Sequence, residues 1–392
     1  MPAVVRSLAA FALALACGLS AAQGPPAAPH VPTVPNPSLA DEASQPVPPP
    51  AEPVKPPQPA KASAPPAAGA PAQSVADIAL VLPLASPDYA RAAEAVRDGF
   101  LAAAKAAGLA HRARVIGHED GGVRGAFDAA EKLGVRVVVG PLVRDDLRAL
   151  AASDKPLPLT LALNQFDDGT PLPPSTYALT LSIEADARLL ANRMRDDQVV
   201  SVALIGGASP LEKRFATAFI DAWLVAGGGP PEVYAFEGAS DALGALRRDL
   251  AKSSAQAAVV TLSGAQAALA RSFAPRLPAF ASSLINEPME RAALADLEGV
   301  VFVDVPWLVH PAAAEFAGLP RPDLGANALQ RLYALGLDAF AVARMFVKGV
   351  PERLDVPGAT GRLTLGDGRL IARAGTFATL RRGQVVPADG PR

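Results

Sequence analysis

Short, nearly continuous apolar runs recur along the chain from residue 75 onward. Runs of this kind are typical of strands that are buried on both faces of a parallel sheet. They predict strands at 78–82, 112–117, 135–140, 158–163, 200–206, 257–262 and 299–305. Because segments with helical periodicity lie between them, the pattern indicates repeated strand–helix–strand units and therefore an α/β fold.

Two amphipathic segments are the clearest helices. The first has an apolar stripe followed by a glycine stop signal: Val96, Phe100, Ala103, Ala107 and Gly108. The second, over 326–348, has a longer stripe: Leu329, Tyr333, Gly336, Phe340, Ala343 and Val347. Near the end of the chain, "LTLGDGRLIAR" places 366–368 (Gly-Asp-Gly) between two β-prone runs, which predicts a hairpin.

The length of the patterned region predicts two lobes. About 320 residues are more than one such sheet normally needs. We expect a folded domain over 75–385, with a first lobe over about 75–180 plus 306–385 and a second lobe over about 181–305. In this arrangement the helix over 326–348 returns to the first lobe.

The first 22 residues have the composition of an export signal. Arg6 supplies a positive start, and an apolar, small-residue run follows that is too short to span a bilayer comfortably. Two cleavage positions compete. A simple cut would fall between Ala22 and Gln23, whereas "ALAC" resembles a lipoprotein signal in which Cys17 is lipidated and becomes the new N-terminus.

A proline-rich segment follows over 23–74. Residues 24–73 hold 17 of the 40 prolines of the chain. Because proline fixes φ and removes a backbone donor, this composition favours polyproline II over a packed core. We expect a disordered linker that can also act as a semi-rigid spacer of up to about 150 Å.

Charge and cysteine content exclude several classes of function. The net charge of −2, with no basic stripe, argues against a nucleic-acid partner. The single cysteine, Cys17, lies in the export signal, so the mature domain has no disulfide and no catalytic or metal-binding thiol. No phosphate-binding loop, nucleophile elbow or metal-binding motif is present, so we expect no metal, no cofactor and no enzymatic activity.

The remaining polar candidates have simple interpretations. His111, His118 and His310 are expected in loops or on the surface. The pairs 145–146 and 196–197 (Asp-Asp) are expected at helix ends. Asp304 lies in an apolar run; alternation favours a side chain that faces solvent, and the alternative is a buried carboxylate, which would need a partner.

Several segments together carry a resemblance to a known family. They are "IALVLPL", "VVVGPLVRDDLRAL", "LPAFASSLIN", "DLEGVVFVDVPWLV", "LQRLYALGLDAFAVA" and "GATGRLTLGDGRLIAR", in this order. Over about 78–385 the chain resembles the bacterial penicillin-binding protein activators, the LppC/LpoA family. The resemblance implies a fold like that of the type I periplasmic binding proteins, with two parallel-sheet, Rossmann-like lobes around a hinged cleft.

The resemblance also implies a function and a compartment. Family members are non-catalytic outer-membrane lipoproteins that stimulate a bifunctional peptidoglycan synthase. We therefore expect an exported protein that activates a class A penicillin-binding protein and is tethered to the outer membrane by lipid at Cys17, or else is soluble in the periplasm. Larger members carry a helical-repeat domain where this chain has its proline-rich segment.

A periplasmic solute-binding protein, specific for an amino acid or a similar small molecule, is the alternative. Residues at strand ends would then form the cleft: Pro83, Ser86, Pro141 and Asn164 in the first lobe, and Ser209, Ser283 and Asn286 in the second. Taken singly, each is better explained as a loop or helix-capping residue. Since 141–144 (Pro-Leu-Val-Arg) lacks the hydroxyls that amino-acid binders present there, we expect no small-molecule ligand.

Overall fold

The computed structural model describes residues 76–166, 169–236, 238, 240–273 and 277–388, all within the compact unit Gly69–Arg392. The predicted export signal over 1–22, Cys17 and the linker over 23–74 lie outside the described residues.

The first lobe contains an eight-stranded sheet. Its strands are β1 (Ile78–Leu82), β2 (Ala113–Gly117), β3 (Val137–Val139), β4 (Thr160–Ala162), β5 (Thr176–Leu179), β11 (Asp355–Pro357), β12 (Arg362–Leu365) and β13 (Leu370–Ala374). They lie in the order β11-β12-β13-β5-β4-β3-β1-β2. All pairs from β13 to β2 are parallel, whereas β12 is antiparallel to both β11 and β13. The predicted hairpin, β12–β13, is confirmed.

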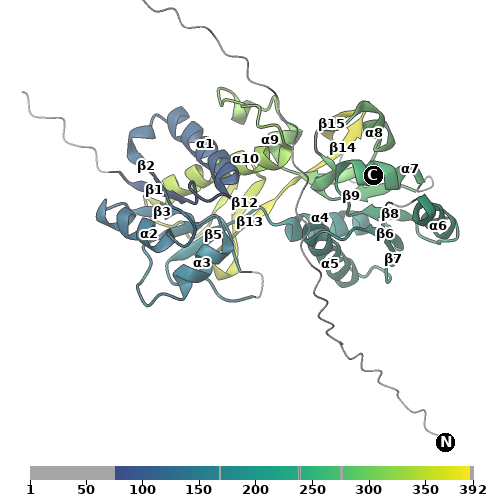
Figure 1. The fold of residues 1–392 in the computed structure, drawn as a ribbon, viewed down its shortest axis with the longest axis horizontal. Helices are drawn as coiled ribbons and strands as arrows, with labels where there is room; N and C mark the ends of the chain where they lie inside the picture. Colours follow the sequence, from purple (N-terminus) through teal and green to yellow (C-terminus); the bar gives the residue numbers. More distant parts are fainter. Residues whose placement is uncertain (1–75, 167–168, 237, 239, 274–276, 389–392) are drawn as a thin grey trace, which may run out of the picture. The chain divides into compact units, whose positions relative to one another are not determined.

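Helices cover both faces of this sheet (Figure 1). On one face lie α1 (Ala90–Ala106) and α10 (Asn327–Phe346), whose Phe100 and Phe340 pack edge to face over Leu80. On the other lie α2 (Val123–Lys132) and α3 (Arg144–Ala151), where Phe127 and Leu150 pack against Val81. Because neighbouring residues of β1 face opposite sides and both sides are covered, the strand is apolar throughout, as the sequence predicts.

Two glycines let α1 and α10 approach closely. A Cβ atom on Gly99 would overlap the carbonyl oxygen of Tyr333, and one on Gly336 would overlap the carbonyl oxygen of Val96. The contacts are with backbone, which cannot rotate away as a side chain can. The prediction that the late helix returns to the first lobe is confirmed, and its Gly336 is the residue that permits the contact.

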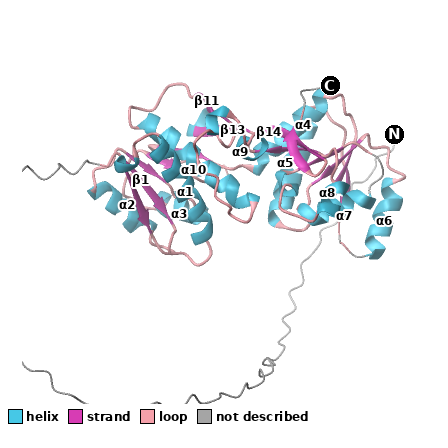
Figure 2. Cartoon of the chain, turned by 90° about the horizontal axis from the view of Figure 1, so that it is seen from above, coloured by secondary structure: helices cyan, strands magenta, loops and turns pink. Residues whose placement is uncertain are grey.

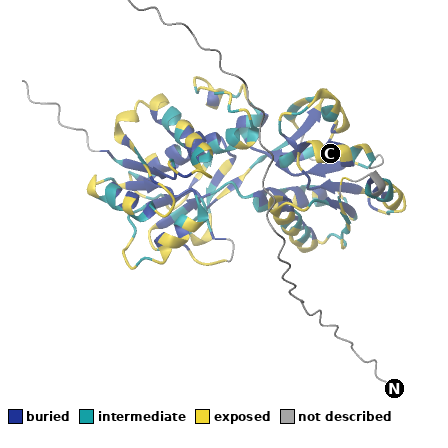
Figure 3. Cartoon of the chain, viewed as in Figure 1, coloured by how far each residue is buried: buried dark blue, intermediate teal, exposed yellow. Residues whose placement is uncertain are grey.

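The second lobe contains a seven-stranded sheet. Its strands are β6 (Val202–Gly206), β7 (Glu232–Ala235), β8 (Ala257–Val260), β9 (Ala279–Ala281), β10 (Val301–Asp304), β14 (Thr376–Arg381) and β15 (Gln384–Pro387), in the order β15-β14-β10-β9-β8-β6-β7. One face packs against α4 (Ile183–Asp196) and α5 (Pro210–Val225). The other packs against α6 (Ser240–Leu250), α7 (Gly264–Phe273) and α8 (Arg291–Asp296). Figure 2 shows the strands of each lobe between helices, and Figure 3 shows that the central strands are buried while exposed residues gather on the outer faces of the helices and in loops.

Short helices complete the described chain. They are α9 (Pro306–Val309) and the 3-10 turns Ala110–Arg112, Ser283–Ile285, Ala314–Phe316 and Asp367–Arg369. In α9, Trp307 is fully buried and packs against Phe316 and Tyr333.

The C-terminal segment is divided between the lobes, which corrects the expectation that 306–385 belongs entirely to the first. Residues 355–374 join the first sheet, but β14 and β15 join the second, where β14 pairs antiparallel with β10. The physical reason is burial: Ala378 and Leu380 of β14 pack into the core of the second lobe. The chain therefore crosses between the lobes a third time, at Gly375.

Candidate functional site

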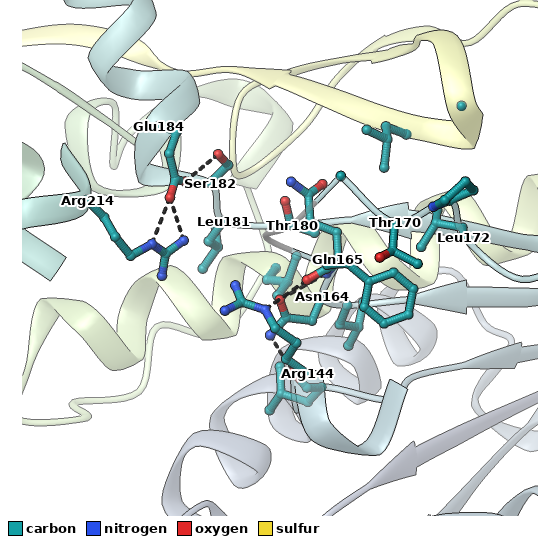
Figure 4. Close-up of a pocket in the computed structure, with 18 of the residues that line it drawn as sticks. Arg144, Asn164, Gln165, Thr170, Leu172, Thr180, Leu181, Ser182, Glu184 and Arg214 are labelled. Carbon is teal, nitrogen blue, oxygen red and sulfur yellow. Dashed lines mark hydrogen bonds and ion pairs between the residues drawn. The ribbon is translucent and has the colours of Figure 1, made fainter. Parts of the chain in front are cut away.

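A cleft of about 680 Å³ lies where β3, β4 and β5 end and where α4 and α5 begin. Ligands of open α/β sheets bind at the carboxyl ends of strands, so this is the place to look for a site. Figure 4 shows polar side chains from both lobes around it. The polar lining includes Arg144, Asn164, Gln165, Thr170, Thr180, Ser182, Glu184, Arg188 and Arg214, and the apolar wall includes Leu142, Phe166, Leu172 and Leu335.

Glu184, in the first turn of α4, is held as a carboxylate on the second-lobe side of the cleft. Its Oε1 accepts a hydrogen bond from Nε of Arg214 at 2.8 Å, and its Oε2 accepts one from Oγ of Ser182 at 2.9 Å. Burial raises the pKa of Glu184, but hydrogen bonds from its own backbone, Ser182 and Arg214 outweigh burial and lower the pKa below the usual value. A carboxylate held in this way is poorly suited to act as a general acid.

Asn164 is the one residue of the seven sequence candidates that lines this cleft. Its Nδ2 donates to the carbonyl oxygen of Leu142 at 3.0 Å, and its Oδ1 accepts from the backbone N–H of Gln165 at 2.9 Å. Nε of Arg144 donates to the carbonyl oxygen of Gln165 at 2.9 Å. These contacts fix the loop after β4, and they engage both ends of the Asn164 amide within the protein.

Ser86 and Pro83 lie in the buried turn that leads into α1. Oγ of Ser86 accepts from the backbone N–H of Tyr89 at 3.3 Å, and the carbonyl oxygen of Pro83 accepts from the Ser86 N–H at 3.2 Å. His118 lies in the loop after β2, in agreement with the prediction of a loop or surface position, but its side chain is buried. Its Nδ1 lies 2.9 Å from the carbonyl oxygen of Glu119. In the loop that follows β1, the polar groups of Ser86 are therefore engaged within the loop itself.

Pro141 and Ser209 are likewise engaged in local structure. Pro141 is buried after β3, and its carbonyl oxygen accepts from the Leu163 N–H at 2.9 Å. Ser209 caps α5: its Oγ accepts from the Glu212 N–H at 3.3 Å, while Oε2 of Glu212 accepts from the Ser209 N–H at 3.1 Å. This reciprocal pair is a capping box, which satisfies donors at the start of the helix.

Ser283 and Asn286 belong to a buried network centred on Arg331 of α10. NH2 of Arg331 donates to the carbonyl oxygen of Ser283 at 2.8 Å, and Nδ2 of Asn286 donates to Oδ2 of Asp304 at 2.8 Å. Nδ2 of Asn327 donates to Oδ1 of Asn286 at 3.1 Å. Arg331 lies on α10, which packs in the first lobe. Ser283 and Asn286 follow β9 and Asp304 ends β10 in the second lobe, so the network joins the two lobes.

Asp304 is the buried acceptor of this network, so the interpretation that it faces solvent is wrong. Its side chain is fully buried, and its two oxygens accept from Nε and NH2 of Arg331, both at 2.8 Å. NH1 of Arg331 also donates to Oε1 of Glu287 at 2.9 Å. Burial opposes the charge of the guanidinium, but Asp304 and Glu287 outweigh burial and raise the pKa of Arg331 above its usual value.

A second buried ion pair lies beside the crossing at Gly375. NH2 of Arg373, at the end of β13, donates to Oδ1 of Asp186 on α4 at 2.7 Å, and both side chains are almost fully buried. Sequence reasoning missed Arg331 and Arg373. The signal available in the sequence was an arginine within a largely apolar helix or strand. Such an arginine can be assigned as a buried charge only when its partner is known.

Asp338 forms a third buried polar contact, within the first lobe. Its Oδ1 accepts from the Ala359 N–H at 2.6 Å, and its Oδ2 accepts from the N–H and Oγ1 of Thr360 at 2.7 and 2.6 Å. Burial raises the pKa of Asp338 to about 6, although the hydrogen bonds from Thr360 and Ala359 oppose the shift. The contact fixes the β11–β12 turn against α10.

The described residues contain no group of three or more His, Cys, Asp or Glu side chains arranged to hold a metal ion. No helix in the described part of the chain has the length and apolar character needed to cross a membrane. The polar candidates of the cleft are instead engaged in turns, caps and contacts between the lobes.

Comparison with known proteins yields close relatives in sequence. The family model described as "LppC putative lipoprotein" matches residues 70–241 and 241–383. Penicillin-binding protein activator LpoA of Mannheimia succiniciproducens is 27% identical over 276 residues, covering 68% of this chain and 48% of the relative. LpoA of Haemophilus ducreyi is 25% identical over 320 residues, covering 79% and 54%. The chain thus spans about half the length of the curated relatives it matches.

Solved structures share the fold. A putative branched-chain amino acid ABC transporter from Chromobacterium violaceum is 33% identical with a TM-score of 0.66, covering 78% of this chain and 99% of the other. The LpoA (YraM) C-domain of Haemophilus influenzae is 24% identical with a TM-score of 0.67, covering 80% and 99%. The predicted two-lobed fold of the periplasmic-binding-protein type is confirmed. Because the family model matches most of the folded domain, the chain belongs to the LppC family of putative lipoproteins.

Proposed function

We propose that this protein is a non-catalytic envelope protein that binds and activates a class A penicillin-binding protein, and so regulates peptidoglycan synthesis. Membership of the LppC family supports the proposal, as do relatives named penicillin-binding protein activators. The LpoA C-domain of Haemophilus influenzae, which shares the fold, is described as a regulator of PBP1A.

The observation that carries the proposal is that the polar residues at the strand ends, of which Asn164 lines the cleft, are engaged within the protein. Recognition of a small polar ligand needs several donors and acceptors that converge on it. Ser86, Ser209 and Asn164 instead satisfy backbone groups of their own loops, and Asn286 bonds to Asp304. A binding fold whose polar loop residues are engaged internally is suited to contacts with a protein.

A solute-binding protein remains the second candidate because two observations favour it. The cleft of about 680 Å³ is large enough for an amino acid, and the Chromobacterium violaceum protein of 33% identity is described as a putative branched-chain amino acid transporter. Titration calorimetry against the amino acids separates the candidates. A ligand bound at micromolar concentration would favour this second function over the first.

Export and lipidation complete the proposal. We infer that lipid on Cys17 anchors the protein in the outer membrane and that residues 23–74 act as the spacer; without lipidation, the protein would be soluble in the periplasm. The mass of the mature N-terminus tests this inference directly. A peptide that begins at lipidated Cys17 supports the tether, whereas one that begins at Gln23 removes it.

The function itself is tested with the full chain and a purified class A penicillin-binding protein of the same organism. Pairwise binding is measured first, and the rate of glycan polymerisation is then measured with and without the chain. The proposal predicts a saturable complex and a faster rate. Absence of both a complex and a rate change would refute it.

A further inference from the structure

A second hollow, which we call the α4–α5 groove, runs along the solvent face of the second lobe. Its volume is about 710 Å³, and its lining comes from both helices: Glu184, Arg188 and Asn192 of α4, and Lys213, Arg214, Thr217, Ala218, Asp221, Ala222 and Val225 of α5. The groove shares Arg188 and Arg214 with the cleft described above, so the two hollows form one continuous surface.

Helical spacing places the three cations at one end of the groove and Ala218, Ala222 and Val225 toward the other, which we call the apolar end although Asp221 lies on its edge. Arg214, Ala218 and Ala222 repeat every four residues along α5, and Lys213 and Val225 lie on the adjacent row. The cations are therefore at the start of the helix, beside the cleft, and the apolar side chains of Ala218, Ala222 and Val225 follow at about one, two and three turns further along. The 16 residues of α5 span about 24 Å, which is the length of a short docked segment.

Two cations of the groove have no partner within the described chain. Arg188 and Lys213 are exposed and form no hydrogen bond or ion pair there, whereas Arg214 is paired with Glu184. A single unpaired surface cation is ordinary. Here, however, two lie together at one end of a hollow on a chain whose net charge is −2.

The apolar end carries the independent observation. Val225 is 91% exposed, more than any other large apolar residue of the described chain. It stands beside Ala222 and Ala218 at the wall of the hollow, where a partner's side chain could cover it. Exposed apolar residues next to a concavity, with charges at the edge, are typical of protein interaction sites.

We propose that the α4–α5 groove docks an acidic segment of a partner protein. The carboxylates of the segment lie over Arg188 and Lys213, and its apolar side chains cover Ala218, Ala222 and Val225. An amphipathic segment seated in a groove by apolar anchors, with opposite charges at the edge, is an established mode of recognition. The identity of the partner as the peptidoglycan synthase rests on the proposed function.

Charge reversal at the groove gives the test, with a matched control on the other lobe. The test variant is R188E/K213E, and the control is K132E/R136E, which reverses two exposed cations of the first lobe whose side chains likewise form no hydrogen bond or ion pair within the described chain. V225D removes the apolar anchor. Thermal unfolding of each full-length variant verifies that folding is unchanged, as expected for exposed residues.

Two binding measurements separate the groove from the identity of the partner. The first uses a model amphipathic peptide of Leu and Glu, followed by fluorescence anisotropy, with a Leu and Lys peptide for comparison. The second uses the synthase, followed by interferometry. At low salt we expect R188E/K213E and V225D each to weaken both interactions at least about tenfold, the loss for the charge variant to shrink as salt rises, and the control to stay within about twofold.

Each outcome decides one of the claims. If the synthase binds the wild type and both groove variants equally, the groove inference is wrong and the proposed function stands. If the synthase does not bind but the acidic peptide does, and R188E/K213E abolishes that binding, the groove inference stands and the proposed function fails. Equal binding of the Lys peptide, or no binding of either probe, overturns the inference.

Discussion

Replacing Arg331 tests the contact that joins the two lobes. In Arg331→Met the side chain keeps most of its length but loses the guanidinium, which donates five hydrogen bonds to Asp304, Glu287 and the carbonyl oxygens of Ser283 and Asn286. The Asp304 side chain is fully buried and would be left without its counter-charge. Removing one partner of a buried ion pair destabilises a protein strongly for this reason.

The magnitude follows from what remains around Asp304. Its oxygens would still accept from Nδ2 of Asn286 and from the N–H of Val305, both at 2.8 Å. The cost should therefore fall at the lower end of the 3–5 kcal/mol usual for such a change, about 3 kcal/mol. For a folded domain of roughly 310 residues, that corresponds to a fall in melting temperature of roughly 5 °C.

Urea unfolding followed by circular dichroism measures this free energy. Arg344→Met, an exposed change on the same helix, is the control and should cost less than about 0.5 kcal/mol. In the double variant Asp304→Asn/Arg331→Met no buried charge is left unpaired, so its loss should be smaller than the sum of the single losses by at least about 1 kcal/mol. A cost below about 1 kcal/mol for Arg331→Met would refute the reasoning.

Three further changes test the packing of the helices and the buried polar contacts. Gly99→Ala forces a Cβ into the backbone of Tyr333, so it should lower the free energy of unfolding, measured by urea titration, by about 1–3 kcal/mol. Gly125→Ala is the control; the space around that position is open, so the change should be neutral or stabilising. Because the pKa of Asp338 is raised to about 6, the folded state binds the proton more tightly than the unfolded state. The free energy of unfolding should therefore fall as pH rises from about 4 to 6 and then level off. Asp338→Asn should remove this dependence from unfolding curves measured across that range, and an unchanged dependence would contradict the raised pKa. Ser209→Ala removes the cap of α5 and should cost about 1 kcal/mol in thermal unfolding, with no loss expected if the hydroxyl does not cap the helix.

The parallel strands were predictable because burial on both faces leaves continuous apolar runs. β1, β6 and β8 all show them, and the structure has a strand at each. Two strands outside the predicted runs are β9, which has three residues, and the edge strand β7, whose exposed positions interrupt its apolar character. The membership of β14 in the second lobe depends on its pairing with β10, which no local pattern encodes.

The site was harder to predict than the fold. Strand ends were the correct places to look, but the polar residues found there, such as Ser209 and Asn286, are engaged in caps and contacts within the protein. Arg331 could not be recognised from the sequence, because a buried arginine depends on partners that lie more than 25 positions away, such as Asp304. Its long-range pairing is a property of the folded chain alone.

The contacts between lobes bear on how such a protein could act. In a hinged solute-binding protein, a ligand shifts the balance between open and closed forms by binding one of them better. Here Arg331 and Arg373 each join the lobes through buried ion pairs. Because breaking a buried ion pair is costly, these contacts oppose a movement that would separate the paired charges.

Activation of the synthase is the property on which the proposed function depends. The rate of glycan polymerisation by a purified class A penicillin-binding protein of the same organism is followed while the full chain is titrated, with bovine serum albumin as the inert control. The account predicts a rate that rises several-fold and saturates near one chain per synthase. A rate that stays constant up to a large molar excess of the chain would contradict it.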